Sequence, residues 1–255
     1  MTAAVEIENL SKTFGTVQAV DSVSFAAHDN EFVSIVGPSG CGKSTLLRMV
    51  AGLIAPNAGE VRLRGASVRA PIADVGMVFQ SAVLLPWRTT LGNILFTAEM
   101  RGERATAYRT RALELIRLTG LRGFEDSLPH QLSGGMQQRA AICRALLLDP
   151  SLVLMDEPFG ALDIITREHM GFELQNIWSA RRKTVLFVTH SITEAVLLSD
   201  LVIVMSARPG RISAEIPIEM PRPRTRDTLR DGKFVELSAR VREEIEARWT
   251  EGAEP

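Results

Sequence analysis

Residues 31–45 have the sequence EFVSIVGPSGCGKST, and this stretch decides the fold. Its first part, Glu31–Val36, is an apolar run of strand length that stops at a glycine-rich turn. After Lys43, apolar residues recur at helical spacing, at Leu46, Met49, Val50 and Leu53. We expect Gly52 to end this helix. A strand, a turn and a helix in this order predict an α/β domain with a parallel-rich sheet.

The turn itself, residues 37–45, fits the pattern G-x-x-x-x-G-K-[ST]. Its glycines let backbone N–H groups surround phosphate oxygens, and the following helix adds the positive end of its dipole. The Lys43 ammonium can reach the β- and γ-phosphates, and the Ser44 hydroxyl can bind Mg²⁺. We therefore predict a nucleotide site, and we interpret Cys41 as a small filler and not as a nucleophile.

A second buried strand, Leu152–Met155, ends in the acids Asp156 and Glu157. The carboxyl ends of strands in an open parallel sheet face the ligand crevice, so we expect both acids beside the phosphate loop. Asp156 would hold Mg²⁺ through water, and Glu157 would polarise an attacking water. The octet LSGGMQQR at 132–139 adds a second anion site, with an N-cap serine and two glycines at a helix start.

Composition excludes several classes of protein. The 255 residues include 29 Lys+Arg and 30 Asp+Glu, and the formal net charge of −1 argues against a globally basic nucleic-acid binder. Two cysteines exclude a disulfide scaffold and suit a reducing compartment. We expect no signal peptide, because Glu6 and Glu8 fall in the first dozen residues. We also expect no bilayer span, because the longest apolar stretches have strand length.

Hydrophobic periodicity divides the chain into strand-rich and helix-rich parts. We expect strands at 5–7, 23–25, within 58–80, at 75–79, 152–155, 184–188, 201–205 and 211–216. We expect helices at 104–119, 134–148 and about 165–182, and a short one opened by a capping box at 191–194. The predicted organisation is one domain over 1–216, with a helical subdomain inserted at about 86–150.

Residues 217–255 form the predicted tail. The part up to residue 234 is rich in proline and arginine, and we interpret it as a linker outside the core. Its basic run at 222–230 is either solvated or lies near anionic lipid. An amphipathic helix is expected at 235–249, with a stripe of Leu237, Val241, Ile245 and Trp249. This stripe either packs on the chain itself or has a regulatory role.

From about residue 5 to 215, the sequence resembles the ATP-binding subunits of ABC transporters. The motifs stand in the family's order: Walker A at 37–45, the glutamine loop at Gln80, the signature octet at 132–139, Walker B at 152–157, the D-loop at 160–163 and the switch histidine at His190. Two positions depart from the family pattern, Met136 in the octet and Gly160 at the start of the D-loop. Neither change removes a catalytic group.

The resemblance implies an ATPase with a P-loop core, a parallel-rich sheet, an N-terminal antiparallel β part and the inserted helical subdomain. It implies ATP and Mg²⁺ as cofactors. Catalysis would fall to Glu157, His190 and Gln80. The ATP contacts would be Phe14, Gly37, Pro38, Ser39, Gly40, Cys41, Gly42, Lys43, Ser44 and Thr45. The Mg²⁺ ligands would be Ser44, Gln80 and Asp156. Phe14 either stacks on adenine or is an ordinary core aromatic.

The octet implies a dimer with a second copy or a close homologue. In the family, one ATP lies between the phosphate loop of one subunit and the octet of the other, here Ser133, Gly134, Gly135 and Gln137. Asp163 would report across this interface. The implied partners are transmembrane permease subunits and, indirectly, a periplasmic or extracellular solute-binding protein, without nucleic acid. The implied location is peripheral, at the cytoplasmic face of the bacterial cell membrane.

Finer strings resemble the nitrate, sulfonate and taurine group of importers. They are QSAVLLPWRTTLGN at 80–93, DEPFGALD at 156–163, ARPGRI at 207–212 and MPRPR at 220–224. Thiamine-precursor and other small-molecule importers of the same group share these strings, which therefore do not name the solute. The predicted solute is a small anion such as nitrate, a sulfonate or taurine. Leu84, Leu85 and Trp87 would receive a helix of the membrane subunit, or Trp87 packs in the helical block. The alternative function is a soluble ABC-class ATPase that is not tied to transport.

Overall fold

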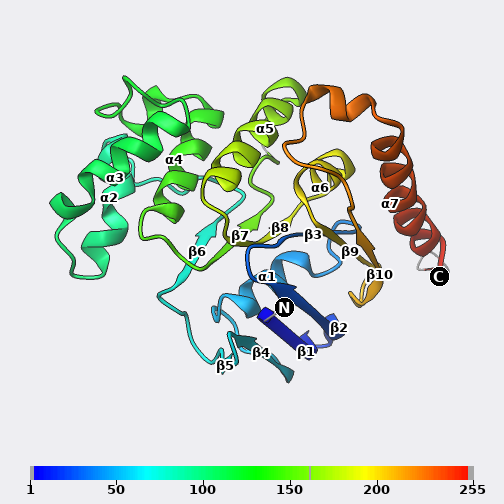
Figure 1. Ribbon diagram of the computed structural model, residues 1–255. Coiled ribbons are helices and arrows are strands. Elements are labelled where there is room, and N and C mark those ends of the chain that lie inside the picture. Colours follow the sequence, from blue (N-terminus) through cyan, green and yellow to red (C-terminus); the bar gives the residue numbers. More distant parts are fainter. Residues whose placement is uncertain (1–2, 161, 252–255) are drawn as a thin grey trace. The chain divides into compact units, whose positions relative to one another are not determined.

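The computed structural model describes residues 3–160 and 162–251, with side chains through Ala247 (Figure 1). The chain forms two compact units. The described parts of residues 1–72 and 182–255 make the first unit, and those of residues 73–181 make the second unit. The predicted domain boundary at residue 216 stays a prediction.

The first unit contains an antiparallel sheet in the order β2-β1-β4-β5. Its strands are β1 (Ala3–Phe14), β2 (Val17–His28), β4 (Ala58–Leu63) and β5 (Ala66–Ser67). Ile7 pairs with Phe25 on one side and with Val61 on the other, and all three are buried. The antiparallel N-terminal part is therefore confirmed. β1 and β2 are much longer than the predicted strands at 5–7 and 23–25.

The first unit also contains the strands that carry the phosphate loop, in the order β10-β9-β3-β8. They are β3 (Phe32–Val36), β8 (Thr184–Val188), β9 (Leu201–Met205) and β10 (Ile212–Pro217). β3 is parallel to both neighbours, with Ile35 opposite Val188 and Ile203. Every residue of β3 and β8 is buried, which explains why apolar runs predicted these strands.

Helix α1 (Lys43–Val50) follows the phosphate loop. Leu46, Leu47, Met49 and Val50 are its buried apolar residues. Leu53 was expected on the same face, and this prediction is wrong, because the helix ends before it and its side chain is 48% exposed. Gly52 has φ +71°, and a Cβ there would lie 2.3 Å from the carbonyl oxygen of Ala70, so the chain turns away at this glycine.

The second unit pairs β6 (Val75–Val78) in parallel with β7 (Leu152–Asp156). Its helices are α2 (Thr90–Met100), α3 (Ala105–Leu118), α4 (Gly134–Leu146) and α5 (Ile164–Ala180), with a 3₁₀ helix at Pro129–Gln131. Residues from α2, α3 and α4 share one apolar cluster, which includes Ile94, Ile116 and Cys143. The predicted helical block therefore has a core of its own.

The tail differs from the expected linker. Ile218, Arg224 and Phe234 are each at most 5% exposed, and a 3₁₀ helix forms at Arg226–Arg230. The prediction that the arginines of this run are solvated is wrong for Arg222 and Arg224. Both guanidinium groups donate to backbone carbonyls near the end of α6 (Ile192–Leu198). These hydrogen bonds replace the water that the arginines would otherwise bind.

Helix α7 (Gly232–Glu251) follows and contacts α6, β9 and β10 in the first unit (Figure 1). Its buried side chains are Phe234, Leu237 and Val241. The predicted stripe thus packs on the chain itself at Leu237 and Val241, whereas the side chain of Trp249 lies outside the described residues. Among the helices of the described chain, none is long and apolar enough to cross a bilayer.

Phe187→Ala should lower the free energy of unfolding by about 3–5 kcal/mol. The ring is fully buried in β8, and its centroid lies 5.7 Å from that of Phe32, so truncation leaves a cavity. Urea titration followed by circular dichroism measures the loss. The control Phe124→Ala removes a ring that is 40% exposed and should cost less than about 1 kcal/mol. Equal losses for the two variants would contradict this account of the core.

Candidate nucleotide site

At two of its glycines, the phosphate loop leaves no space for a side chain. Gly37 has φ +154°, and a Cβ there would lie 2.6 Å from the carbonyl oxygen of Met205. Gly42 has φ +99° and directly precedes α1, and a Cβ there would lie 2.5 Å from the carbonyl oxygen of Ala19. Neighbouring backbone therefore forces the loop into one narrow path between β3 and α1.

Lys43 points into this loop. Its side chain is buried, and its Nζ lies 2.9 Å from the carbonyl oxygen of Gly37 and 2.8 Å from that of Pro38. The Cys41 Sγ is 3.7 Å from the same ammonium. Burial raises the pKa of the Cys41 thiol, which stays protonated at neutral pH and is a poor nucleophile. The loop thus holds a positive charge at its inner side.

The expected magnesium ligands are hard oxygen donors. They are the hydroxyl of Ser44 at the start of α1, the amide of Gln80 after β6, and the carboxylate of Asp156 at the end of β7. Such donors suit Mg²⁺, which keeps waters and phosphate oxygens in its coordination sphere. Among the described residues, no cluster of three or more His, Cys, Asp or Glu side chains is placed to hold a metal ion.

In the second unit, the structure brings Gln80 and Glu157 together. The Gln80 amide donates to a Glu157 carboxylate oxygen at 3.3 Å. Glu157 has φ +46°, a left-handed conformation that non-glycine residues rarely adopt and that concentrates at functional sites. The carbonyl of Glu157 accepts from the N–H of Gly160 at 3.0 Å, which closes the turn after Walker B.

Gln138 is a site residue that the sequence analysis missed. Its side chain is buried, and its amide donates to the carbonyl of Phe79 at 3.1 Å. Phe79 directly precedes Gln80, so the signature helix α4 holds the glutamine loop through this bond. No sequence signal points to the role of Gln138, because its side chain is polar and its partner is a backbone carbonyl.

The signature octet begins α4 as predicted. The Ser133 hydroxyl accepts from the N–H of Met136 at 3.3 Å, and the Gln137 amide donates to the carbonyl of Pro129 at 2.9 Å. A Cβ on Gly135 would lie 3.3 Å from the Thr166 side chain, whereas one on Gly134 would meet nothing within 4 Å. Packing inside the second unit therefore constrains Gly135 but leaves Gly134 open.

Asp163 caps helix α5. Its carboxylate accepts from the N–H of Thr166 at 2.9 Å and from the Thr166 hydroxyl at 2.6 Å. These hydrogen bonds lower the pKa of the Asp163 carboxyl. Arg167, another residue without a sequence signal, donates to the carbonyls of Gly160 and Leu162. Ala161 of the D-loop lies outside the described residues.

Phe14 and His190 belong to the first unit. Phe14 is 49% exposed, so the alternative of a core aromatic is wrong. The Lys12 ammonium lies 5.3 Å from the centroid of this ring, within reach of a cation–π contact. His190 follows β8 and is exposed. It lines a pocket of about 450 Å³ in the first unit, together with Gly37, Pro38, Ser39, Ile192, Thr193, Arg242, Ile245 and Glu246.

Trp87 lies on the surface of the second unit. Its side chain is 73% exposed, so the alternative that it packs in the helical block is wrong. The buried side chain of Asn93 organises the turn around it, accepting from the N–H of Leu85 at 2.7 Å and donating to the carbonyls of Leu85, Arg88 and Thr89. This network holds the turn in a shape that leaves the Trp87 indole outside.

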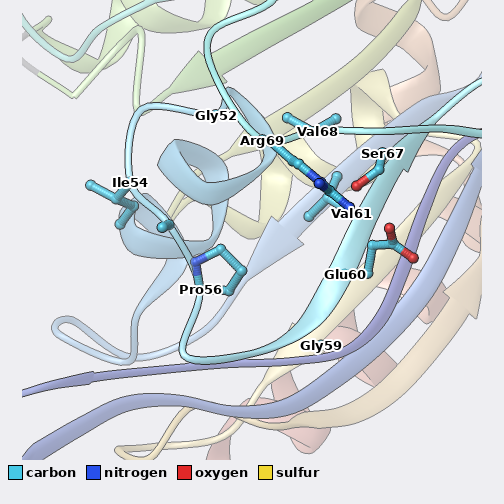
Figure 2. A pocket seen from close by; sticks show the side chains of 10 residues that line it. Gly52, Ile54, Pro56, Gly59, Glu60, Val61, Ser67, Val68 and Arg69 are labelled. Carbon is cyan, nitrogen blue, oxygen red and sulfur yellow. The ribbon is translucent and has the colours of Figure 1, made fainter.

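A second pocket, of about 320 Å³, lies in the first unit (Figure 2). Glu60, Ser67 and Arg69 give it polar atoms, while Ile54, Pro56, Val61 and Val68 give it apolar ones (Figure 2). Hydrogen bonding from Ser67 lowers the pKa of the Glu60 carboxyl. None of the predicted site residues lines this pocket.

Comparison with known proteins agrees with these motifs. The family model of the ABC transporter matches residues 20–160. An uncharacterized ABC transporter ATP-binding protein of Methanocaldococcus jannaschii is 48% identical over 245 residues, covering 94% of this chain and 91% of that protein. The taurine import ATP-binding protein TauB of Rhizobium johnstonii is 46% identical, covering 91% of this chain and 89% of that protein.

Solved structures share the fold. The dimeric post-hydrolysis structure of the ATP-binding cassette MJ0796, bound to ADP and Pi, has a TM-score of 0.74 and 33% identity. It covers 85% of this chain and 100% of that chain. The chain belongs to the ABC transporter family, and it is an ATPase with the α/β cassette fold of that family.

Asp163→Asn should make the free energy of unfolding depend less on pH in the acidic range. The folded-state pKa of Asp163 is lowered, so its stabilisation is present above its unfolded value, about 3.9, and is lost as pH falls through the folded value. Asparagine caps a helix equally well but does not titrate. Urea midpoints at pH 3, 4, 5 and 7 should therefore fall more steeply for the wild type than for the variant.

The control for this titration is Asp126→Asn. Asp126 is exposed and lies in the loop before the 3₁₀ helix at Pro129–Gln131, where it caps no helix. This variant should follow the wild-type curve at every pH. If the urea midpoints of the wild type and of Asp163→Asn fall in parallel with pH, the Asp163 carboxylate does not contribute to the pH dependence of stability.

Proposed function

We propose that this chain is the ATP-hydrolysing subunit of a membrane importer for a small sulfonate-type anion, working as a dimer. The observation that carries the importer assignment is the 46% identity to a taurine import ATP-binding protein over nine-tenths of both chains. Taurine, other sulfonates and nitrate share a compact anionic group. The ATP-binding domain would be residues 1–216, with its helical subdomain at about 86–150 facing the membrane subunit.

The phosphate loop would bind the triphosphate of ATP. Its path leaves no space for side chains at Gly37 and Gly42, which supports close approach of phosphate oxygens to the backbone. The Lys43 ammonium would exchange two loop carbonyls for the more negative β- and γ-phosphates. The exposed ring of Phe14 would stack on adenine.

Glu157 would act as the general base that takes a proton from the attacking water. Its contact with the Gln80 amide supports this role, because the amide fixes the direction of the carboxylate. Ser44, Gln80 and Asp156 would hold Mg²⁺, which when bound neutralises charge on the phosphate oxygens. His190 would contact the γ-phosphate, since it lines one pocket with the phosphate loop.

The dimer would place the octet of one copy over the ATP held by the other. Gly134 supports this arrangement, because no neighbour in its own unit explains the missing side chain. Asp163 and the D-loop would report across the same interface. Closure around ATP and release after hydrolysis would drive transport.

The membrane partner would be a permease at the cytoplasmic face of the cell membrane, supplied with solute by a separate binding protein. The exposed Trp87 supports a contact with a helix of that permease, and Val83, four residues earlier in the chain, is 59% exposed. Large exposed apolar groups of this kind mark protein interaction sites. Leu84 and Leu85 would form the base of this contact.

Lys43→Ala should weaken ATP binding by about tenfold to hundredfold, because hydrogen bonds to a charged group contribute about 1.5–3 kcal/mol. Isothermal titration with ATP measures the dissociation constant. Arg48→Ala is the control, since Arg48 lies on the exposed side of the same helix and should leave the affinity unchanged. Unchanged ATP affinity in Lys43→Ala would remove its assigned role.

Glu157→Gln should keep ATP binding but slow hydrolysis by at least about a hundredfold, because the amide cannot accept the proton. With ATP present, the variant should elute as a dimer from a sizing column. Phosphate release and light scattering measure the two effects. The control Glu236→Gln, on the exposed face of α7, should behave as the wild type. Wild-type turnover in Glu157→Gln would show that another group is the base.

A tagged Glu157→Gln variant also tests the transport assignment. We expect it to co-purify, with ATP, from detergent-solubilised native membranes together with a multi-span membrane protein in about equal amounts. Solute uptake by the reconstituted pair then identifies the anion. Recovery from the soluble fraction alone, or with ribosomal or repair proteins, would favour the soluble ABC-class ATPase instead.

A further inference from the structure

Arg224 is the largest fully buried side chain among the described residues. Its guanidinium donates to the carbonyls of Val196, Leu197 and Ser199 at 2.9, 3.0 and 2.6 Å. It also donates to the carbonyls of Ile218 and Met220 at 3.2 and 3.3 Å. Burial lowers the pKa of this guanidinium to about 10, so it remains charged at neutral pH.

Three of these five carbonyls lie at the C-terminal end of α6. The last carbonyls of a helix have no partner within it, and its dipole places negative charge there. A buried cation at this end is therefore favourable, and it requires the backbone to stay where the guanidinium can reach it. Arg224 fixes the C-terminal end of α6 in the way that a cap does.

Arg222 holds the same segment from a second direction. Its guanidinium lies 2.8 Å from a carboxylate oxygen of Asp200 and 2.6 Å from the carbonyl of Leu198. The other carboxylate oxygen of Asp200 accepts from the N–H of Phe32 at 3.0 Å. Phe32 starts β3, the strand that leads to the phosphate loop. Arg222 therefore ties the end of α6, through Asp200, to the strand that leads to the phosphate loop.

His190 lies just before the N-terminal end of α6. Its two neighbours in the chain, Thr189 and Ser191, both form hydrogen bonds with Glu194 of that helix. The Thr189 hydroxyl donates to the Glu194 carboxylate at 2.5 Å and accepts from the N–H of Ser191 at 3.0 Å. The Ser191 hydroxyl accepts from the N–H of Glu194 at 3.3 Å. Helix α6 has seven residues, about 10 Å, so a shift at one end moves the other.

The position of α6 brings His190 into the pocket of about 450 Å³ that the phosphate loop also lines. His190 and the first turn of α6, Ile192 and Thr193, line it together with residues of the phosphate loop, Gly37–Ser39. Helix α7 supplies further lining and packs on α6. A seven-residue helix is not stable by itself, so its position depends on what holds its ends. Arg224 holds one of these ends through three hydrogen bonds.

We propose that Arg224 is a positioning residue for ATP hydrolysis, which holds α6 so that His190 faces the phosphate loop. The proposal rests on the proposed function, in which His190 contacts the γ-phosphate. It assigns a catalytic consequence to the Met220–Arg224 stretch, in which no site residue was predicted. It also explains why a proline-rich tail contains a fully buried cation.

The test compares Arg224→Met and Arg224→Lys with Arg230→Met. Arg230 is exposed in the same tail and serves as the matched control. Single-turnover hydrolysis of labelled ATP gives the rate, and titration gives the dissociation constant. We expect Arg224→Met to slow hydrolysis by about tenfold or more with ATP affinity within about twofold of the wild type. Arg224→Lys should be intermediate, and Arg230→Met should be unchanged.

A double-mutant cycle with His190→Ala separates positioning from general loss of structure. If Arg224 acts through His190, the double variant should hydrolyse ATP no more slowly than His190→Ala alone. Multiplied losses in the cycle, wild-type rates in Arg224→Met, or an equal loss of ATP affinity would overturn the proposal. Should Arg224→Met fail to fold by circular dichroism, the same cycle with Arg224→Lys decides by the same criteria.

The same measurements distinguish a failure of the proposed function from a failure of the role of Arg224. A wild-type chain that does not hydrolyse ATP would contradict the proposed function. A wild-type chain that hydrolyses ATP, combined with multiplied losses in the cycle, would contradict the role of Arg224 alone.

Discussion

The Lys43 ammonium, enclosed by the carbonyls of its own glycine loop, is the interaction on which the rest of the structure depends. A buried cation is tolerable only where fixed dipoles surround it, so the loop must keep one path. Backbone of Met205 and Ala19 enforces that path at Gly37 and Gly42. The fully buried strand β3 and helix α1 then hold the loop at both ends.

In the second unit, hydrogen bonds fix the negatively charged carboxylate of Glu157. In the proposed mechanism Glu157 would act on the attacking water, and its carboxylate would then need a fixed direction. The Gln80 amide fixes it, and Gln138 of the signature helix fixes the backbone before Gln80. The glutamine loop, the signature helix and the Walker B glutamate are thus one hydrogen-bonded set, and a change in any of them reaches the others.

Prediction from sequence succeeded where burial is uniform along an element. The predicted strands at 184–188 and 201–205 match β8 and β9 to the residue, because both strands are almost wholly buried and all their residues except Thr184 are apolar. It located β1 and β2 but not their full lengths, because polar outward residues and register shifts hide the alternation in the rest of each strand. It also failed at Leu53, where close contact of Gly52 with Ala70 decides the end of the helix.

The sequence by itself determined the family, the order of the motifs and the chemical groups of the candidate site, because these depend on short spacings along the chain. Only the tertiary structure decided which polar groups meet. Gln138 reaching Phe79, and Arg224 reaching the end of α6, join segments without a shared period or motif. The partners of Gln138 and Arg224 are backbone carbonyls. Because every residue carries a carbonyl, the residue types in the sequence cannot predict which one accepts the hydrogen bond.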